Sequence, residues 1–122
     1  MLDFTKHIMD KTQNHTYNDL EACRVAAYFV QNGRCYVTDT ILKAGQRELH
    51  HRKPRKCDGK DEPENLILLA KAVHKMVHAS NQEEFNIYWN QIPLTEEQLL
   101  MLNHLRVEAY EHPMKREARR LS

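Results

Sequence analysis

Four of the eight histidines in this 122-residue chain lie within 29 residues, and their spacing could support metal and proton chemistry. They form a neighbouring pair, His50 and His51, and a spaced pair, His74 and His78. Neutral imidazoles bind transition metals, and histidine exchanges protons near neutral pH. Residues four apart on a helix project from one face, so His74 and His78 have a chelating spacing. By itself this spacing is a weak indicator, because many such surface pairs bind nothing.

The neighbouring pair cannot share one task on a regular strand, because successive side chains point to opposite faces. Either His50 or His51 can turn toward the helix that carries the spaced pair and complete a three-histidine site. The other can then face a substrate. The residue pattern alone leaves open which histidine does which.

Two short strands and a helix are the elements that must position these histidines. Residues 47–53 are expected to be extended, because Pro54 biases the preceding residue toward extended geometry and stops a helix. A charged loop follows over 55–63, then an apolar strand over 65–69 and a helix over 71–79. The order is a strand with His-His, a loop, a second strand, and a helix with His-x-x-x-His.

Further elements are predicted on both sides of this unit. Helices are expected over 17–32, 82–91 and 95–110. A β-prone run, broken by a turn, is expected over 34–42. Thr95 and Gln98 form a capping-box pattern that begins the last helix. Phe85, Tyr88 and Trp89 are expected to pack in the core rather than to stack on bases.

The composition, with 41% apolar and 29% charged residues, is that of one small globular domain. No apolar run approaches the roughly 18 residues that span a bilayer, so we expect a cytoplasmic protein with no membrane partner. The three cysteines form no Cys-x-x-Cys pair and are expected to be free thiols. The chain is expected to form a single domain, 1–122. Its expected parts are a loose N-terminus (1–16), a helix with a hairpin start (17–42), a ββα core that holds the candidate metal site (48–79), C-terminal helices (80–112) and a basic tail (113–122).

The charge is unevenly distributed along the chain. The net charge is only +1, but residues 43–60 carry seven basic and two acidic side chains, a local net charge of +5. Such a segment could face nucleic-acid phosphates. Charge alone favours the plainer alternative of a solvated surface loop.

Residues 48–78, ELHHRKPRKCDGKDEPENLILLAKAVHKMVH, place four short patterns in order. These are His-His-x-x-Pro, a glycine-bearing loop, Asp-x-x-x-Asn-Leu and His-x-x-x-His. Their order resembles the HNH endonuclease motif, the ββα-metal nuclease fold. Over about residues 17–110 the chain is similar to the C-terminal endonuclease domain of group II intron reverse transcriptase/maturases, which are mobile-element proteins. The resemblance implies an α+β fold, with a small ββα-metal core and flanking helices.

The resemblance also implies roles for individual residues. Three histidines would ligate one divalent metal ion: His50, His74 and His78. His51 would be the general base, and Asn65 would hold the loop so that a backbone carbonyl orients His51. Glu48 would support the metal ligands from the same strand face. Four basic residues would contact phosphates: Arg52, Lys53, Arg55 and Lys56.

The implied activity is hydrolysis of phosphodiester bonds in DNA, as a nick in one strand. Imidazole ligands suit Zn or Ni, whereas activity could use Mg or Mn. RNA is not excluded as a substrate, and a partner domain could supply targeting. The alternatives are a catalytically silent nucleic-acid-binding module with the same fold, a ribonuclease, and a structural zinc site. The chain departs from the family in Asp58-Gly59, where Gly-Gly is common, and in the absence of paired Cys-x-x-Cys motifs.

Overall fold

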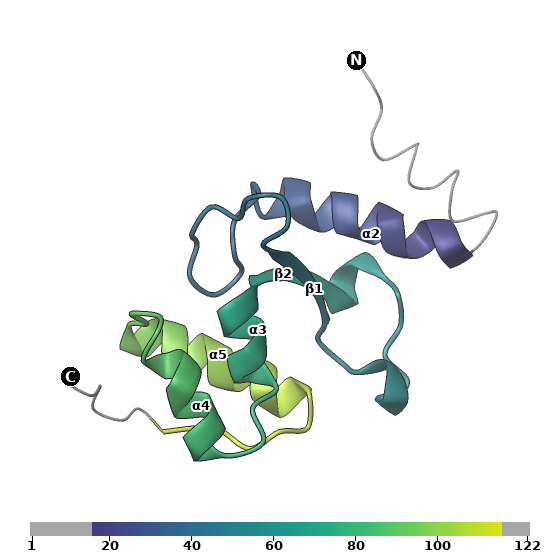
Figure 1. Ribbon diagram of the computed structural model, residues 1–122. Coiled ribbons are helices and arrows are strands. Elements are labelled where there is room, and N and C mark those ends of the chain that lie inside the picture. Colours follow the sequence, from purple (N-terminus) through teal and green to yellow (C-terminus); the bar gives the residue numbers. More distant parts are fainter. Residues whose placement is uncertain (1–15, 116–122) are drawn as a thin grey trace.

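A computed structural model describes residues 16–115, with side chains from residue 20 onward. The expected loose N-terminus and most of the expected basic tail lie outside the described residues. Figure 1 shows α2 on one side of the two strands and the other three helices gathered on the opposite side. The elements, in chain order with two 3-10 turns (η1 and η2), are α2 (Thr16–Val30), β1 (Arg47–His51), η1 (Arg55–Cys57), η2 (Pro63–Asn65), β2 (Leu66–Ala70), α3 (Lys71–Val77), α4 (Gln82–Trp89) and α5 (Glu96–Glu108).

The two strands form an antiparallel hairpin that leads directly into α3. Glu48 pairs with Leu69 and His50 pairs with Ile67 across the sheet. Strand β2 is buried from Leu66 to Leu69, because α2 covers it on one side and the α3–α5 helices pack on the other. The predicted α+β class is confirmed, and each predicted helix appears within a few residues of its expected ends.

The expected hairpin start within 17–42 is only partly formed. Residues 34–42 contain a single antiparallel bridge between Arg34 and Ile41, around a turn in which Asp39 has a φ of 60°. The free edge of β2 is completed by a side chain and by one backbone group of this segment. The amide of Gln31 donates to the Leu68 carbonyl and accepts from the Leu68 backbone N–H, at 2.9 Å each, and the Tyr36 N–H also donates to the Leu68 carbonyl, at 3.1 Å. Backbone groups of a buried strand need partners, and these groups supply them without a regular third strand.

The core confirms the expected packing of the C-terminal helices. Phe85 and Trp89 are almost fully buried in α4. The capping box of Thr95 and Gln98 is formed at the start of α5, with both reciprocal hydrogen bonds present. None of the described helices is both long and apolar enough to cross a membrane.

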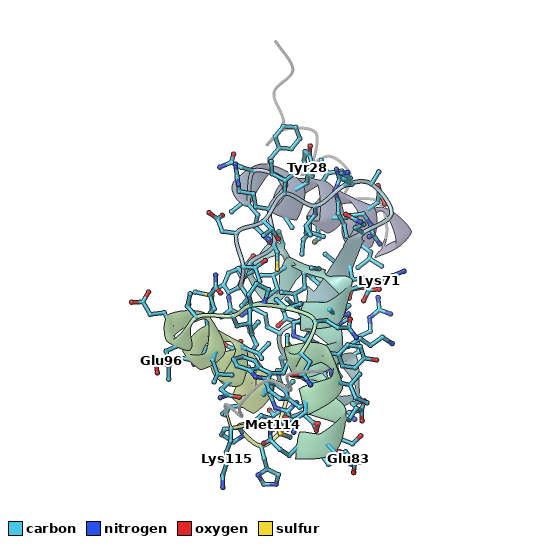
Figure 2. The ribbon with its side chains drawn as sticks, turned by 60° about the vertical axis from the view of Figure 1, so that its left-hand side comes forward. Tyr28, Lys71, Glu83, Glu96, Met114 and Lys115 are labelled. Atoms are coloured by element: carbon cyan, nitrogen blue, oxygen red, sulfur yellow. The ribbon has the colours of Figure 1, made fainter. Side chains whose placement is uncertain are left out.

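The segment after α5 returns to the start of α4. The backbone of Lys115 exchanges two hydrogen bonds with the side chain of Gln82, and Met114 does the same with Asn103. Figure 2 shows Met114 and Lys115 near Glu83, at the opposite end of the molecule from Tyr28. These first residues of the expected basic tail are therefore fastened to the helices.

A buried arginine holds the end of α3. Arg106 of α5 is 1% exposed, and its Nη1 donates to the carbonyls of Met76 and Val77 at 2.8 and 2.9 Å. Its Nε donates to the His112 carbonyl at 2.6 Å, and burial lowers the pKa of the Arg106 guanidinium. The last carbonyls of a helix lack partners within the helix, so Arg106 caps α3 and ties it to α5.

Replacing Arg106 by alanine is expected to lower the free energy of unfolding by about 3 kcal/mol or more, because three backbone carbonyls lose their donor. Urea denaturation followed by circular dichroism measures this loss. The control is Arg24→Ala on the exposed side of α2, which is expected to change stability by about 0.5 kcal/mol or less. Equal stabilities of the two variants would contradict the capping role.

Candidate metal centre

Three histidines from two elements converge on one point. His50 comes from β1, His74 from the middle of α3, and His78 from the residue that ends α3. One ring nitrogen from each lies within 4.8 Å of the other two. The ring centroids are 5.1, 5.1 and 4.9 Å apart. The hairpin register and the one-turn spacing on α3 together produce this convergence, and the three residues could hold a metal ion.

The most buried of the three carries an unsatisfied nitrogen. His50 is 1% exposed, and among the described residues no hydrogen-bond partner reaches its Nε2 atom. An unpaired buried polar atom costs about 1–3 kcal/mol, so it needs an explanation. A metal ion at the centre of the cluster would satisfy it. The residues present therefore fit a bound ion.

The same burial keeps His50 neutral. Desolvation, followed by the neighbouring charges of His74 and His78, lowers the pKa of His50 to about 3. Burial also lowers the pKa of His78. Metals bind the neutral form of imidazole, so these two groups are prepared as ligands without loss of a proton at neutral pH.

Glu48 orients the third ligand. Its Oε1 atom lies 2.7 Å from Nδ1 of His74, and Glu48 shares a strand face with His50 because they are two residues apart. When the Glu48 carboxylate accepts a hydrogen bond from the Nδ1–H group of His74, the lone pair of that ring is on Nε2 and is available to a metal. Carboxylates commonly hold metal-binding histidines in this way.

His51 points away from the cluster, as period-two alternation predicts. Its Nε2 atom lies 2.7 Å from Oδ1 of Asp61, and Oδ2 of Asp61 lies 2.9 Å from Nη2 of Arg55. The partner of the His51 ring in the described residues is thus a carboxylate rather than the expected backbone carbonyl. No role was predicted for Asp61 from the sequence, although this residue begins the Asp-x-x-x-Asn-Leu pattern.

Asn65 clamps the loop between the strands. Asn65 was expected to begin the second strand, but it is the last residue of η2, and β2 begins at Leu66. Its Oδ1 accepts from the Lys53 N–H at 2.8 Å, and its Nδ2 donates to the carbonyls of Lys53 and Lys60 at 3.1 and 3.0 Å. The loop passes so close that a Cβ on Gly59 would lie 1.8 Å from the Lys53 oxygen. Glycine is therefore required at this position.

The four basic residues expected to contact phosphates are in two different situations. Arg52 makes a two-bond ion pair with Glu108 of α5, at 3.0 and 3.1 Å, and Arg55 pairs with Asp61. Lys53 and Lys56 are exposed and have no salt bridge among the described residues. Phosphate binding stays a prediction for all four, and only the two lysines offer free charges.

The comparisons with known proteins returned no match from family models, curated proteins or solved structures. The candidate centre is therefore defined by its own geometry. That geometry is a hairpin followed by helices, with a cluster of three histidines and a fourth histidine on the other face of the strand.

The metal-free protein is expected to lose stability as the pH falls below about 6.5. Unfolded histidines titrate near that value, whereas folded His50 has a pKa of about 3. Between these pH values the unfolded chain binds more protons, so the free energy of unfolding rises with pH, by up to about 1.4 kcal/mol per pH unit for one histidine.

Urea denaturation of EDTA-treated protein from pH 4 to 7 measures this slope. The variant His50→Gln is expected to reduce it by about one histidine's share, and the exposed control His112→Gln to leave it unchanged. A slope in His50→Gln equal to that of the original protein would contradict the burial argument.

Proposed function

We propose that this protein is a metal-dependent HNH endonuclease that hydrolyses phosphodiester bonds in DNA. The supporting observation is the three-histidine cluster on a hairpin–helix unit, with a fourth histidine on the opposite strand face. The family comes from the resemblance of residues 48–78 to the HNH motif. The mobile-element context comes from the wider resemblance of about residues 17–110 to the endonuclease domain of group II intron maturases.

The proposal divides the chemistry between the two strand faces. His50, His74 and His78 would hold one divalent ion. The bound ion would supply positive charge to the phosphate and to the leaving oxygen. His51 would take a proton from the attacking water, which is a task for a neutral imidazole near pH 7. Asn65 would keep the loop in place beneath that base.

The ligand set favours particular metals. Three neutral imidazoles suit Zn and Ni, whereas Mg prefers oxygen ligands. Binding is therefore expected to follow the transition-metal order, strongest for the ions that imidazole prefers. Activity could still be highest with Mg or Mn, because tight binding and fast turnover are separate demands.

A plasmid assay tests the proposed function. Supercoiled DNA is incubated with purified protein and Mg, Mn, Ni or Zn, and open-circular product is expected with at least one of them but not with EDTA. His51→Ala prepared in parallel excludes a contaminating nuclease. A single-stranded RNA substrate distinguishes a ribonuclease. Metal and DNA binding without cleavage of either substrate would instead support the catalytically silent module.

The dependence of DNA affinity on salt should be shallow. Each phosphate contact on duplex DNA contributes about −0.9 to the slope of log affinity against log salt. With Arg52 and Arg55 engaged by carboxylates, Lys53 and Lys56 predict a slope near −2, against about −3 to −4 if all four contribute.

Fluorescence anisotropy with a labelled duplex measures this slope. The double variant Lys53→Ala/Lys56→Ala is expected to remove nearly all of it. The charge-matched control Arg24→Ala/Lys71→Ala alters exposed basic residues of α2 and α3, outside the basic segment 43–60, and should keep it. The reverse result would place the binding surface elsewhere on the molecule.

A further inference from the structure

We propose that Asp61 is the positioning residue for His51, holding its ring with the proton on Nε2 so that Nδ1 accepts the proton of the attacking water. This inference deepens the proposed function and rests on it. The motif resemblance assigns no role to Asp61.

The tautomer follows from the partners of the ring. The Oδ1 atom of Asp61 lies 2.7 Å from Nε2 of His51, a short charge-assisted contact. Hydrogen bonding from Arg55, then from His51, lowers the pKa of the Asp61 carboxyl, so it is ionised and can only accept. A neutral imidazole carries one N–H, which must therefore be on Nε2. The lone pair is then on Nδ1, for which no hydrogen-bond partner occurs among the described residues.

Both the carboxylate of Asp61 and the backbone next to it are held in place. Arg55 donates to both of its oxygens, through Nε at 3.2 Å and Nη2 at 2.9 Å. The preceding residue, Lys60, has its carbonyl fixed by Asn65 at 3.0 Å. A base placed by groups that are themselves locked keeps the geometry that proton transfer needs. Arg55 thus acts by fixing the carboxylate of Asp61.

In the proposed reaction His51 takes one proton from water as the phosphodiester bond is exchanged for a bond to the water oxygen. The water oxygen bonds to phosphorus as its proton moves to Nδ1 of His51, and the bond from phosphorus to the leaving oxygen breaks. The leaving oxygen takes a proton from solvent. The imidazolium that forms carries two N–H groups, and the negative charge of Asp61 stabilises it in place. His51 returns to its starting tautomer when Nδ1 releases its proton to water.

The variant Asp61→Ala removes both carboxylate oxygens, and with them the acceptor that holds the Nε2–H group of His51. The ring is then free to carry its proton on Nδ1 or to turn away from the water, and either change removes the base. We expect kcat to fall by about 10²–10⁴-fold with KM nearly unchanged. Asp61→Glu, which keeps the carboxylate, should restore part of the loss.

The matched control is Asp58→Asn. Asp58 lies in the same loop, and its side chain is 83% exposed; among the described residues its carboxylate is paired with Lys60 alone, at 3.4 Å. It removes the same charge at nearly the same place, so it reports any general effect on DNA affinity. Its kcat is expected to equal that of the original protein.

Nitrogen-15 NMR of the zinc-loaded protein reads the tautomer directly, with His51→Ala identifying the His51 signals. We expect the Nε2–H form in the original protein and a mixture of the two tautomers in Asp61→Ala. The Nδ1–H form in the original protein, or an Asp61→Ala variant with unchanged tautomer and kcat, would overturn the inference. If the original protein cleaves no nucleic acid with any metal, the proposed function fails, while the NMR spectra still decide whether Asp61 positions His51.

Discussion

Replacing His51 by alanine is expected to abolish cleavage while leaving metal binding nearly intact. Loss of a general base slows a reaction by about 10²–10⁴-fold. The side chain of His51 faces Asp61 rather than the three-histidine cluster, so its removal takes no ligand from the candidate metal centre. A nicking assay and isothermal titration calorimetry with Zn measure the two properties on the same preparation.

The control for this variant is His112→Ala, which removes an exposed histidine far from the loop in sequence. It should leave both rate and affinity unchanged. If His51→Ala folds but no longer binds metal, His51 is the ligand and His50 the base, so the proposed roles of these two neighbours are exchanged. Unchanged cleavage by His51→Ala would remove the general base from the mechanism.

Replacing His74 by alanine is expected to remove metal binding and cleavage together. The cluster would keep two nitrogens, and the carboxylate of Glu48 would lose its partner at 2.7 Å. Glu48→Gln should have a milder effect, weakening metal affinity by about 10–100-fold, because it leaves all three ligands but disturbs the orientation of one.

Thermal unfolding provides a measurement that does not depend on activity. Metal at about 100 times its dissociation constant adds about 2.7 kcal/mol to the free energy of unfolding, which should raise the Tm by about 10 °C. We expect this shift in the original protein and in the control His104→Ala, an exposed histidine on α5, but not in His74→Ala. A Tm that no divalent ion changes would exclude the three-histidine site.

Much of this molecule follows from local patterns along the chain. The capping box of Thr95 begins α5, and the apolar run after Asn65 forms the buried strand. The first strand precedes Pro54 as expected, but it ends at His51, two residues before the end of the predicted range 47–53. Period-two alternation separates His50 from His51, because it depends only on adjacent residues of one strand. The helical spacing of four likewise places two ligands on one face. These relations hold within single elements, so they can be predicted before the elements are assembled.

Other features depend on residues that meet only after folding. The sequence predicted Arg52 and Arg55 as similar loop cations, but packing brings one against Glu108, 56 residues away, and the other against Asp61. Gln31 bonds the edge of β2 from 37 residues away, where the expected β-prone run supplies one backbone hydrogen bond from Tyr36. No periodicity encodes such partners, because each depends on the angle and distance at which two elements pack.

The candidate centre combines both kinds of determinant. The identities and spacing of His74 and His78 are local, whereas their meeting with His50 requires the hairpin to fold back against α3. The burial that leaves Nε2 of His50 unpartnered and keeps its imidazole neutral is a property of the assembled core. Ligand chemistry can therefore be predicted from residue types along the chain, while protonation and orientation depend on desolvation and on neighbours that packing alone supplies.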